Sequence, residues 1–300
     1  MRITHRAVTH TALLGLNGNL AAVGRLQQQL TSGKVISAPS DSPTGTNTAM
    51  RARRDQSAAL QHARNISDGQ SRLDATDSAL SAIVGQVQQV RAKTVQGLNT
   101  GSMSATSRQA IGVEVGELRE SLLGLANSTI DGRPLFGGPT TEGTAYDPAT
   151  GGYVGVGGAG GTPVVPILRR VSDSEQIRVD VTGPEAFGPP GSDLFTVVSD
   201  IADHVVTDPD ALSSDLAALD VALARLLDAA SAIGARSARM EAAAQVNTDL
   251  QLTLKTQLAG VEDVDLAKTI MELSQQQVGY QAALQATANV IQPTLVDFLR

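Results

Sequence analysis

The sequence "DLAKTIMELSQQQVGYQAALQATANVIQPTLVDFLR", residues 265–300, carries an apolar stripe at helical spacing almost to its last residue. The stripe recurs at steps of three, four and seven residues, which predicts an amphipathic helix with a heptad seam. Its members are Leu266, Ile270, Leu273, Gln277, Tyr280, Leu284 and Ile291. Lys268 and Glu272 are the only charges from Leu266 to Val296. Exposed helices normally carry more charge than this, so the sequence predicts that another protein chain packs against this helix.

A helix of the same kind is predicted at the other end, over residues 7–31. Arg25 is its only charge between Ala7 and Leu30. Its seam is formed by Leu13, Leu16, Leu20, Val23, Gln27 and Leu30. Both ends of the chain therefore present low-charge helices with one glutamine in each seam.

A pair made only of these two helices would be marginally stable. Ordering roughly 60 residues costs about 1–2 kcal/mol each in backbone entropy, whereas each large seam side chain returns about 1.5–3 kcal/mol. We therefore expect copies of the same protein, or its relatives, to cover these faces, and we expect the ends to order as they assemble. The predicted assembly interface is Leu13, Leu16, Leu20, Val23, Leu30, Leu266, Ile270, Leu273, Tyr280, Leu284 and Ile291.

The middle of the chain predicts long helices whose leucine stripes form an intramolecular core. A helix from Thr44 to about Leu98 would be roughly 80 Å long at about 1.5 Å per residue. Ser42-Pro43 is a typical start for it, because serine caps free N–H groups and proline suits the first turn. Further helical patterns follow around residues 105–130 and from Asp208 to about Gly260.

Residues 139–191 differ in composition, since they hold seven of the twelve prolines between short β-rich runs. The predicted fold class is mainly α: an elongated antiparallel helical bundle, with coiled coil, built from both chain ends, with a small β-rich insertion. The predicted domains are the terminal assembly helices (1–43 and 261–300), the long-helix bundle (44–138 and 192–260) and the variable insertion (139–191).

Composition excludes several functional classes. The 300 residues carry a net charge of −7, which does not favour nucleic-acid binding. The only dense basic cluster is formed by Arg51, Arg53 and Arg54. It is interpreted as a solvated helix face. The absence of cysteine excludes disulfides, thiolate metal sites and a cysteine nucleophile. The polar residues in "AVTHTALLGLNGNLAAV" do not fit a secretory signal, and no run of 18 apolar residues predicts a membrane span.

No catalytic, cofactor or metal site is predicted. "GVGGAG", Gly155 to Gly160, fits a dinucleotide-binding spacing, but the prolines that follow exclude the helix that such a site needs. "SGK" at 32–34 lacks the flanking residues of a phosphate-binding loop, and Asp41 is interpreted as a capping residue. The scattered histidines do not form a zinc ligand set: His5, His10, His62 and His204.

Three stretches resemble the flagellin superfamily of axial proteins, and within it the hook-associated branch. They are "LQQQLTSGKVISAPSDSP" (26–43), "LRESLLGLANSTIDGRPLFGG" (118–138) and the terminal segment quoted above, with "QAALQ" at 281–285 and Asp297-Phe298-Leu299. The resemblance covers roughly residues 1–138 and 192–300. Its loop motif falls on Ser32, Gly33, Lys34, Pro39, Ser40, Asp41 and Pro43.

The resemblance implies a non-enzymatic structural protein, exported unfolded by the flagellar type III apparatus, that acts at the hook–filament junction. It implies that the terminal helices assemble a ring of identical subunits. The implied partners are further copies of the chain, hook-associated protein 1, flagellin and a cytoplasmic export chaperone, with no nucleic acid, no membrane insertion and no cofactor.

Two alternatives remain open at the level of sequence. The first is a short flagellin that forms the filament itself. The second, from another class, is a helical-bundle secretion effector or adhesin that binds through residues 139–191.

Overall fold

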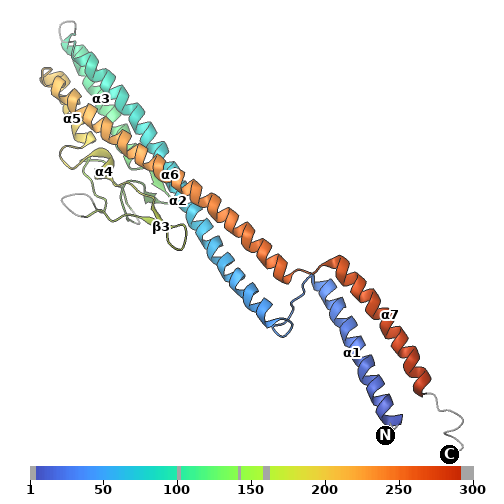
Figure 1. Ribbon diagram of the computed structural model, residues 1–300. Helices are drawn as coiled ribbons and strands as arrows, with labels where there is room; N and C mark the ends of the chain where they lie inside the picture. The colour runs from blue at the N-terminus through green and yellow to red at the C-terminus, as the bar shows by residue number, and fades with distance from the viewer. Residues whose placement is uncertain (1–4, 100–102, 141–142, 158–162, 292–300) are drawn as a thin grey trace, which may run out of the picture. The chain divides into compact units, whose positions relative to one another are not determined.

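The computed structural model describes residues 5–99, 103–140, 143–157 and 163–291, without the side chains of residues 5, 6, 8 and 289–291. Over these residues the fold is mainly α, as predicted (Figure 1). The helices are α1 (His5–Ser32), α2 (Pro43–Gly97), α3 (Ala105–Ala126), α4 (Gly183–Phe187), α5 (Leu194–Thr207), α6 (Leu212–Glu262) and α7 (Leu266–Ile291). Four short strands accompany them: β1 (Thr129–Ile130), β2 (Arg133–Pro134), β3 (Leu168–Arg170) and β4 (Gln176–Arg178).

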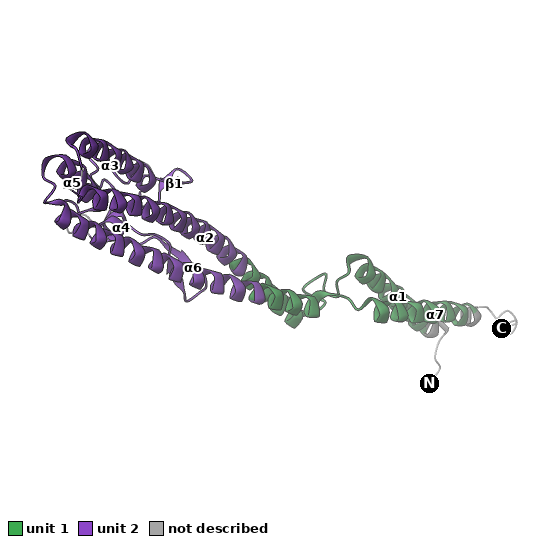
Figure 2. Ribbon diagram, turned by 90° about the horizontal axis from the view of Figure 1, so that it is seen from above, with its two compact units in different colours: residues 1–58, 250–300 green, residues 59–249 purple. Residues whose placement is uncertain are grey.

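The chain divides into two compact units, each drawn in its own colour in Figure 2. We call residues 1–58 and 250–300 the terminal unit, and residues 59–249 the central unit. This division crosses α2 and α6, whereas the sequence places its boundaries at residues 43 and 261. The three-part division of the sequence therefore stays a prediction.

Five helices belong to the central unit: α3, the short α4, α5 and the parts of α2 and α6 that lie in it (Figure 2). The α2 and α6 helices run antiparallel, since Gln70 bonds to Ser237 at 2.7 Å and Arg91 bonds to Asp220 at 2.7 Å. The predicted stripe of α2 faces inward, and its buried members are Leu73, Leu80, Ile83, Val87 and Val90. The start of α2 is also as predicted: its first residue is Pro43, and the Ser42 Oγ accepts a hydrogen bond from the Gly45 N–H at 3.1 Å.

The start of α6 differs from the sequence interpretation. Asp208 ends α5 instead, since its backbone N–H donates to the His204 carbonyl at 2.9 Å, and α6 begins only at Leu212. His204 also bonds through Nδ1 to Asp215 Oδ2 in the first turn of α6, at 2.7 Å. The hydrogen bond to Asp215 raises the pKa of His204, and the charges of Asp215, Asp200 and Asp208 add to the rise.

Residues 139–191 contain little regular strand among the described residues. The β3–β4 pair is antiparallel, with Arg169 opposite Ile177, and Tyr146 and Tyr153 form an isolated bridge. The Asp131-Gly132 turn between β1 and β2 has positive φ angles of 50° and 75°, which are typical of a two-residue hairpin turn.

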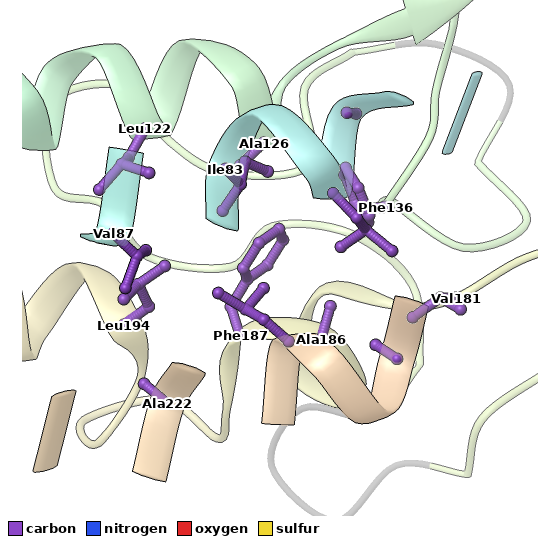
Figure 3. Packing of buried hydrophobic residues seen from close by; sticks show 14 of the residues in the cluster. Ile83, Val87, Leu122, Ala126, Phe136, Val181, Ala186, Phe187, Leu194 and Ala222 are labelled. Carbon is purple, nitrogen blue, oxygen red and sulfur yellow. The ribbon is translucent and has the colours of Figure 1, made fainter. Parts of the chain in front are cut away.

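The insertion shares the core of the central unit. Buried Phe187 lies among Ile83, Val87 and Leu194 (Figure 3). Tyr146 contacts Phe195 edge-on with ring centroids 4.7 Å apart. The chain has three tyrosines and four phenylalanines, and five of these rings cluster here: Phe136, Tyr146, Tyr153, Phe187 and Phe195. The scarce aromatic bulk of the chain therefore anchors the insertion to the bundle.

Candidate assembly site

Helices α1 and α7 pack against each other in the terminal unit through two rows of shielded side chains. We call these rows the paired seam. Each row follows steps of four and three, the spacing of a coiled coil. The rows consist of Ala12, Leu16, Asn19, Val23, Leu26 and Leu30 on α1, and of Thr269, Leu273, Gln276, Tyr280, Ala283 and Thr287 on α7.

A polar contact lies within the paired seam. The Gln276 Nε2 donates a hydrogen bond to the Asn19 Oδ1 at 3.1 Å. A polar pair at one seam position fixes the register of two helices, because any slip would leave both amides without a partner. Gln27 and Gln277, which the sequence places in the seams, are instead exposed.

A second set of apolar side chains on the same two helices faces away from the seam. We call these the outer faces: Leu13, Leu14, Leu20, Leu266, Ile270, Met271, Val278 and Leu284. Their exposed fractions run from 42% to 67%. Among the described side chains of α1 and α7, only Thr269 is fully buried. The pair thus leaves most of its apolar surface in contact with water.

The structure divides the predicted interface between these two surfaces. Five of its residues lie in the paired seam: Leu16, Val23, Leu30, Leu273 and Tyr280. Five lie on the outer faces: Leu13, Leu20, Leu266, Ile270 and Leu284. Ile291 ends α7, and its side chain lies outside the described residues. Sequence reasoning missed the smaller and polar seam members, such as Ala12, Asn19 and Gln276, because leucines occur on more than one face of each helix.

The loops next to α1 and α7 are joined by ion pairs. The Lys34 Nζ lies 2.6 Å from Asp263 Oδ1 and 3.5 Å from Glu262 Oε2, and the Arg53 Nη2 lies 2.7 Å from Glu262 Oε1. Glu262 is almost fully buried, so two cations offset the cost of its desolvation. The hydrogen bond to Asp263 raises the pKa of Lys34.

Backbone contacts join the same two segments. The Val35 N–H donates to the Glu262 carbonyl at 2.7 Å, and the Val264 N–H donates to the Gly33 carbonyl at 3.0 Å. Gly33 has a φ of +69°, which a residue with a side chain adopts only with strain. The motif glycine and lysine thus connect the end of α1 to the segment between α6 and α7.

The rest of the motif forms a turn around Asp41. Its Oδ2 accepts bonds from the Ala38 N–H at 2.9 Å and from the Ser37 N–H and Oγ at 3.0 and 2.9 Å. These hydrogen bonds, the one from Ala38 foremost, lower the pKa of Asp41. Ser32 accepts a bond from the Lys34 N–H, whereas Pro39 and Ser40 are exposed. Asp41 therefore organises the loop before α2 and does not cap the helix, so the capping interpretation of this residue is wrong; Ser42 supplies the cap.

The described part of the chain holds no group of three or more metal-ligating His, Cys, Asp or Glu side chains. None of the described helices is long and apolar enough to cross a membrane. Of the "GVGGAG" loop, Gly158, Ala159 and Gly160 lie outside the described residues.

Both end regions of the chain match models of known protein families. Residues 3–141 match the bacterial flagellin N-terminal helical region, and residues 216–299 match the bacterial flagellin C-terminal helical region. The matched regions contain α1, α7 and the loop motif, so they include the whole candidate assembly site.

Comparison with individual proteins gives a consistent result. The chain is 26% identical to flagellar hook-associated protein 3 of Salmonella typhimurium, over 94% of this chain and 95% of the relative. It is 25% identical to flagellin of Bacillus subtilis over the full length of both. Its fold resembles that of the flagellar junction protein FlgL from Legionella pneumophila, with a TM-score of 0.58 and 15% identity over 72% of this chain and all of the other.

Proposed function

The chain belongs to the flagellin family, and from this we propose that it is a structural component of the bacterial flagellum that joins the hook to the flagellin filament. The outer faces of α1 and α7 carry this proposal. They expose eight large apolar side chains on helices with almost no charge. Such surfaces are stable in water only when other subunits cover them.

The mechanism follows from the two surfaces of the helix pair. The paired seam and the Asn19–Gln276 bond hold α1 and α7 in register within one subunit. The outer faces then present one apolar surface to neighbouring copies. Burial of the remaining exposed half of these side chains contributes about 1–2 kcal/mol each, and it is repeated in every subunit. Assembly thus supplies the stabilisation that the isolated pair lacks.

Four partners are part of the proposal. They are other copies of this chain arranged in a ring, hook-associated protein 1 on the hook side, flagellin on the filament side and an export chaperone in the cytoplasm. The similarity to hook-associated protein 3 over 94% of the chain favours the junction over the filament. The relatives are structural flagellar proteins, which agrees with a role without catalysis.

Deletion of the gene tests the junction role. The expected result is cells that build hooks, lack filaments and release flagellin into the medium, with restoration by the wild-type gene. Filaments attached to hooks in the deletion strain would contradict the proposal.

The second candidate is a short flagellin, which the similarity to the Bacillus subtilis protein supports. Immunogold labelling of isolated flagella separates the two. Label confined to the hook–filament boundary supports the adaptor, whereas label along the whole filament supports flagellin.

A further inference from the structure

A pocket of about 500 Å³ in the central unit lies between α2, the β1–β2 turn and β3. Its charged lining consists of Arg64, Arg72, Arg133, Arg169, Asp68 and Asp131. Four cations and two anions give a local charge of +2 in a chain whose net charge is −7. A basic pocket in an acidic chain needs a separate explanation.

The fold gathers these arginines from separate segments. Arg64, Asp68 and Arg72 are spaced four residues apart and so lie along one face of α2. The hairpin turn at Asp131-Gly132 brings Arg133 to this face, and Arg169 comes from β3. Ser67 and Ser71 add hydroxyl groups between the arginines.

Three of the four arginines have hydrogen-bond partners within the protein, and those of Arg169 and Arg64 are side chains. The Arg169 Nε binds Asp68 Oδ2, and the Arg64 Nη2 binds the side chain of Gln61. Among the described residues, the Arg133 side chain has neither a hydrogen bond nor an ion pair, and it is exposed.

Arg72 is the unusual member of the pocket. Only 8% of its surface is exposed, and its Nη2 donates to the carbonyls of Pro134 and Leu135 at 3.1 and 3.2 Å. Its Nε is buried and has no hydrogen-bond partner. Burial lowers the pKa of Arg72, and the nearby charges of Arg169 and Arg133 lower it further, although Asp180 and Asp68 act in the opposite direction. Arg72 therefore adds its positive charge to the wall of the pocket, although its Nε itself is inaccessible.

We propose that this pocket binds an oxyanion, a carboxylate or phosphate group, held by the guanidinium groups of Arg133 and Arg64 beside the buried charge of Arg72. Guanidinium groups bind such anions through paired, charge-assisted hydrogen bonds. Two sources fit this chemistry: a free anion, and an acidic side chain of a neighbouring subunit. The proposal concerns the central unit and does not depend on the function proposed above.

Inorganic phosphate added to the full-length monomer at constant ionic strength tests the site. The side-chain Nε–H signal of Arg72, followed by NMR, is expected to shift in a saturable way. Arg133→Gln is expected to weaken phosphate binding about tenfold, because a charge-assisted hydrogen bond is lost.

Arg51→Gln is the matched control, since Arg51 is also an exposed arginine on α2 but lies outside the pocket. It is expected to leave binding unchanged. The proposal is overturned if the Arg72 signal does not saturate with phosphate, or if both variants bind phosphate equally. Constant ionic strength matters because simple screening would affect all exposed arginines.

A polymerisation assay identifies the source of the anion. If saturating phosphate and Arg133→Gln both slow assembly while Arg51→Gln does not, the occupant is an acidic side chain of a neighbouring subunit. If phosphate binds as expected and assembly is unchanged in all cases, the occupant is a free anion.

Discussion

At the residue scale, single polar groups set where elements begin, end and align. Ser42 caps α2, Asp41 organises the loop before it, and the Asn19–Gln276 bond lies in the paired seam. The sequence predicts the first, because capping depends only on residues three or four positions apart, whereas it assigned Asp41 to a cap and not to the loop. It misses the third, since Asn19 and Gln276 meet only when the chain ends pair.

The His204–Asp215 contact predicts a dependence of stability on pH. The pKa of His204 is raised in the folded state, so the folded chain binds the proton more tightly than the unfolded chain. This contribution is fully present below the ordinary histidine pKa of about 6.5, and it is lost as pH rises through the higher folded pKa. The melting-temperature advantage of wild type over His204→Gln is therefore expected to shrink from pH 6 to pH 8.5.

His10→Gln is the control for that experiment, because His10 is exposed and lies in the terminal unit. Scanning calorimetry at several pH values gives both comparisons. If the advantage of wild type over His204→Gln stays constant with pH, the ion pair does not contribute as described.

At the element scale, α1 and α7 each contribute to two surfaces, the paired seam and the outer faces, and substitutions on each surface are expected to have different effects. Leu16 lies in the paired seam, so Leu16→Ala is expected to destabilise the helix pair by about 1–2 kcal/mol, roughly half the value for a fully buried leucine. Leu20 is 51% exposed, so Leu20→Ala is expected to change monomer stability by less than about 0.5 kcal/mol.

The substitution on the outer face, which has little effect on monomer stability, is expected to affect assembly. Leu20→Ala is expected to reduce polymerisation, measured by sedimentation, although local stability measured by amide exchange in α7 is unchanged. If Leu20→Ala polymerised as wild type does, the outer faces would not be the assembly surface. Leu60→Ala controls for the general effect of losing an exposed leucine, because Leu60 is exposed on α2 in the central unit.

At the scale of the whole molecule, the two units differ in how they are stabilised. The central unit has a continuous core that includes Leu73, Leu122 and Phe187, each nearly inaccessible to solvent. The helix pair of the terminal unit has mostly half-buried contacts. A shallow apolar contact stabilises less than a closed core, so the two units should open with different free energies.

Amide hydrogen exchange tests this difference in dilute monomer and in polymer. Amides of α1 and α7 are expected to exchange much faster than those of α3 in the monomer, and to become protected on assembly. This outcome would support the prediction that the chain ends order as they assemble. Equal, strong protection of α1 and α3 in the monomer would contradict it.

The sequence by itself determined the long helices, the start of α2 and the family, because helical periodicity, caps and motifs are local properties of the chain. The 55-residue α2 shows this: it was predicted from Thr44 to about Leu98 and spans Pro43–Gly97. Only the tertiary structure decided which leucine of α1 faces α7 and which faces water, and which arginines of α2, β2 and β3 share a pocket. Those facts depend on segments far apart in the chain meeting in one register, which the spacing within a single helix does not specify.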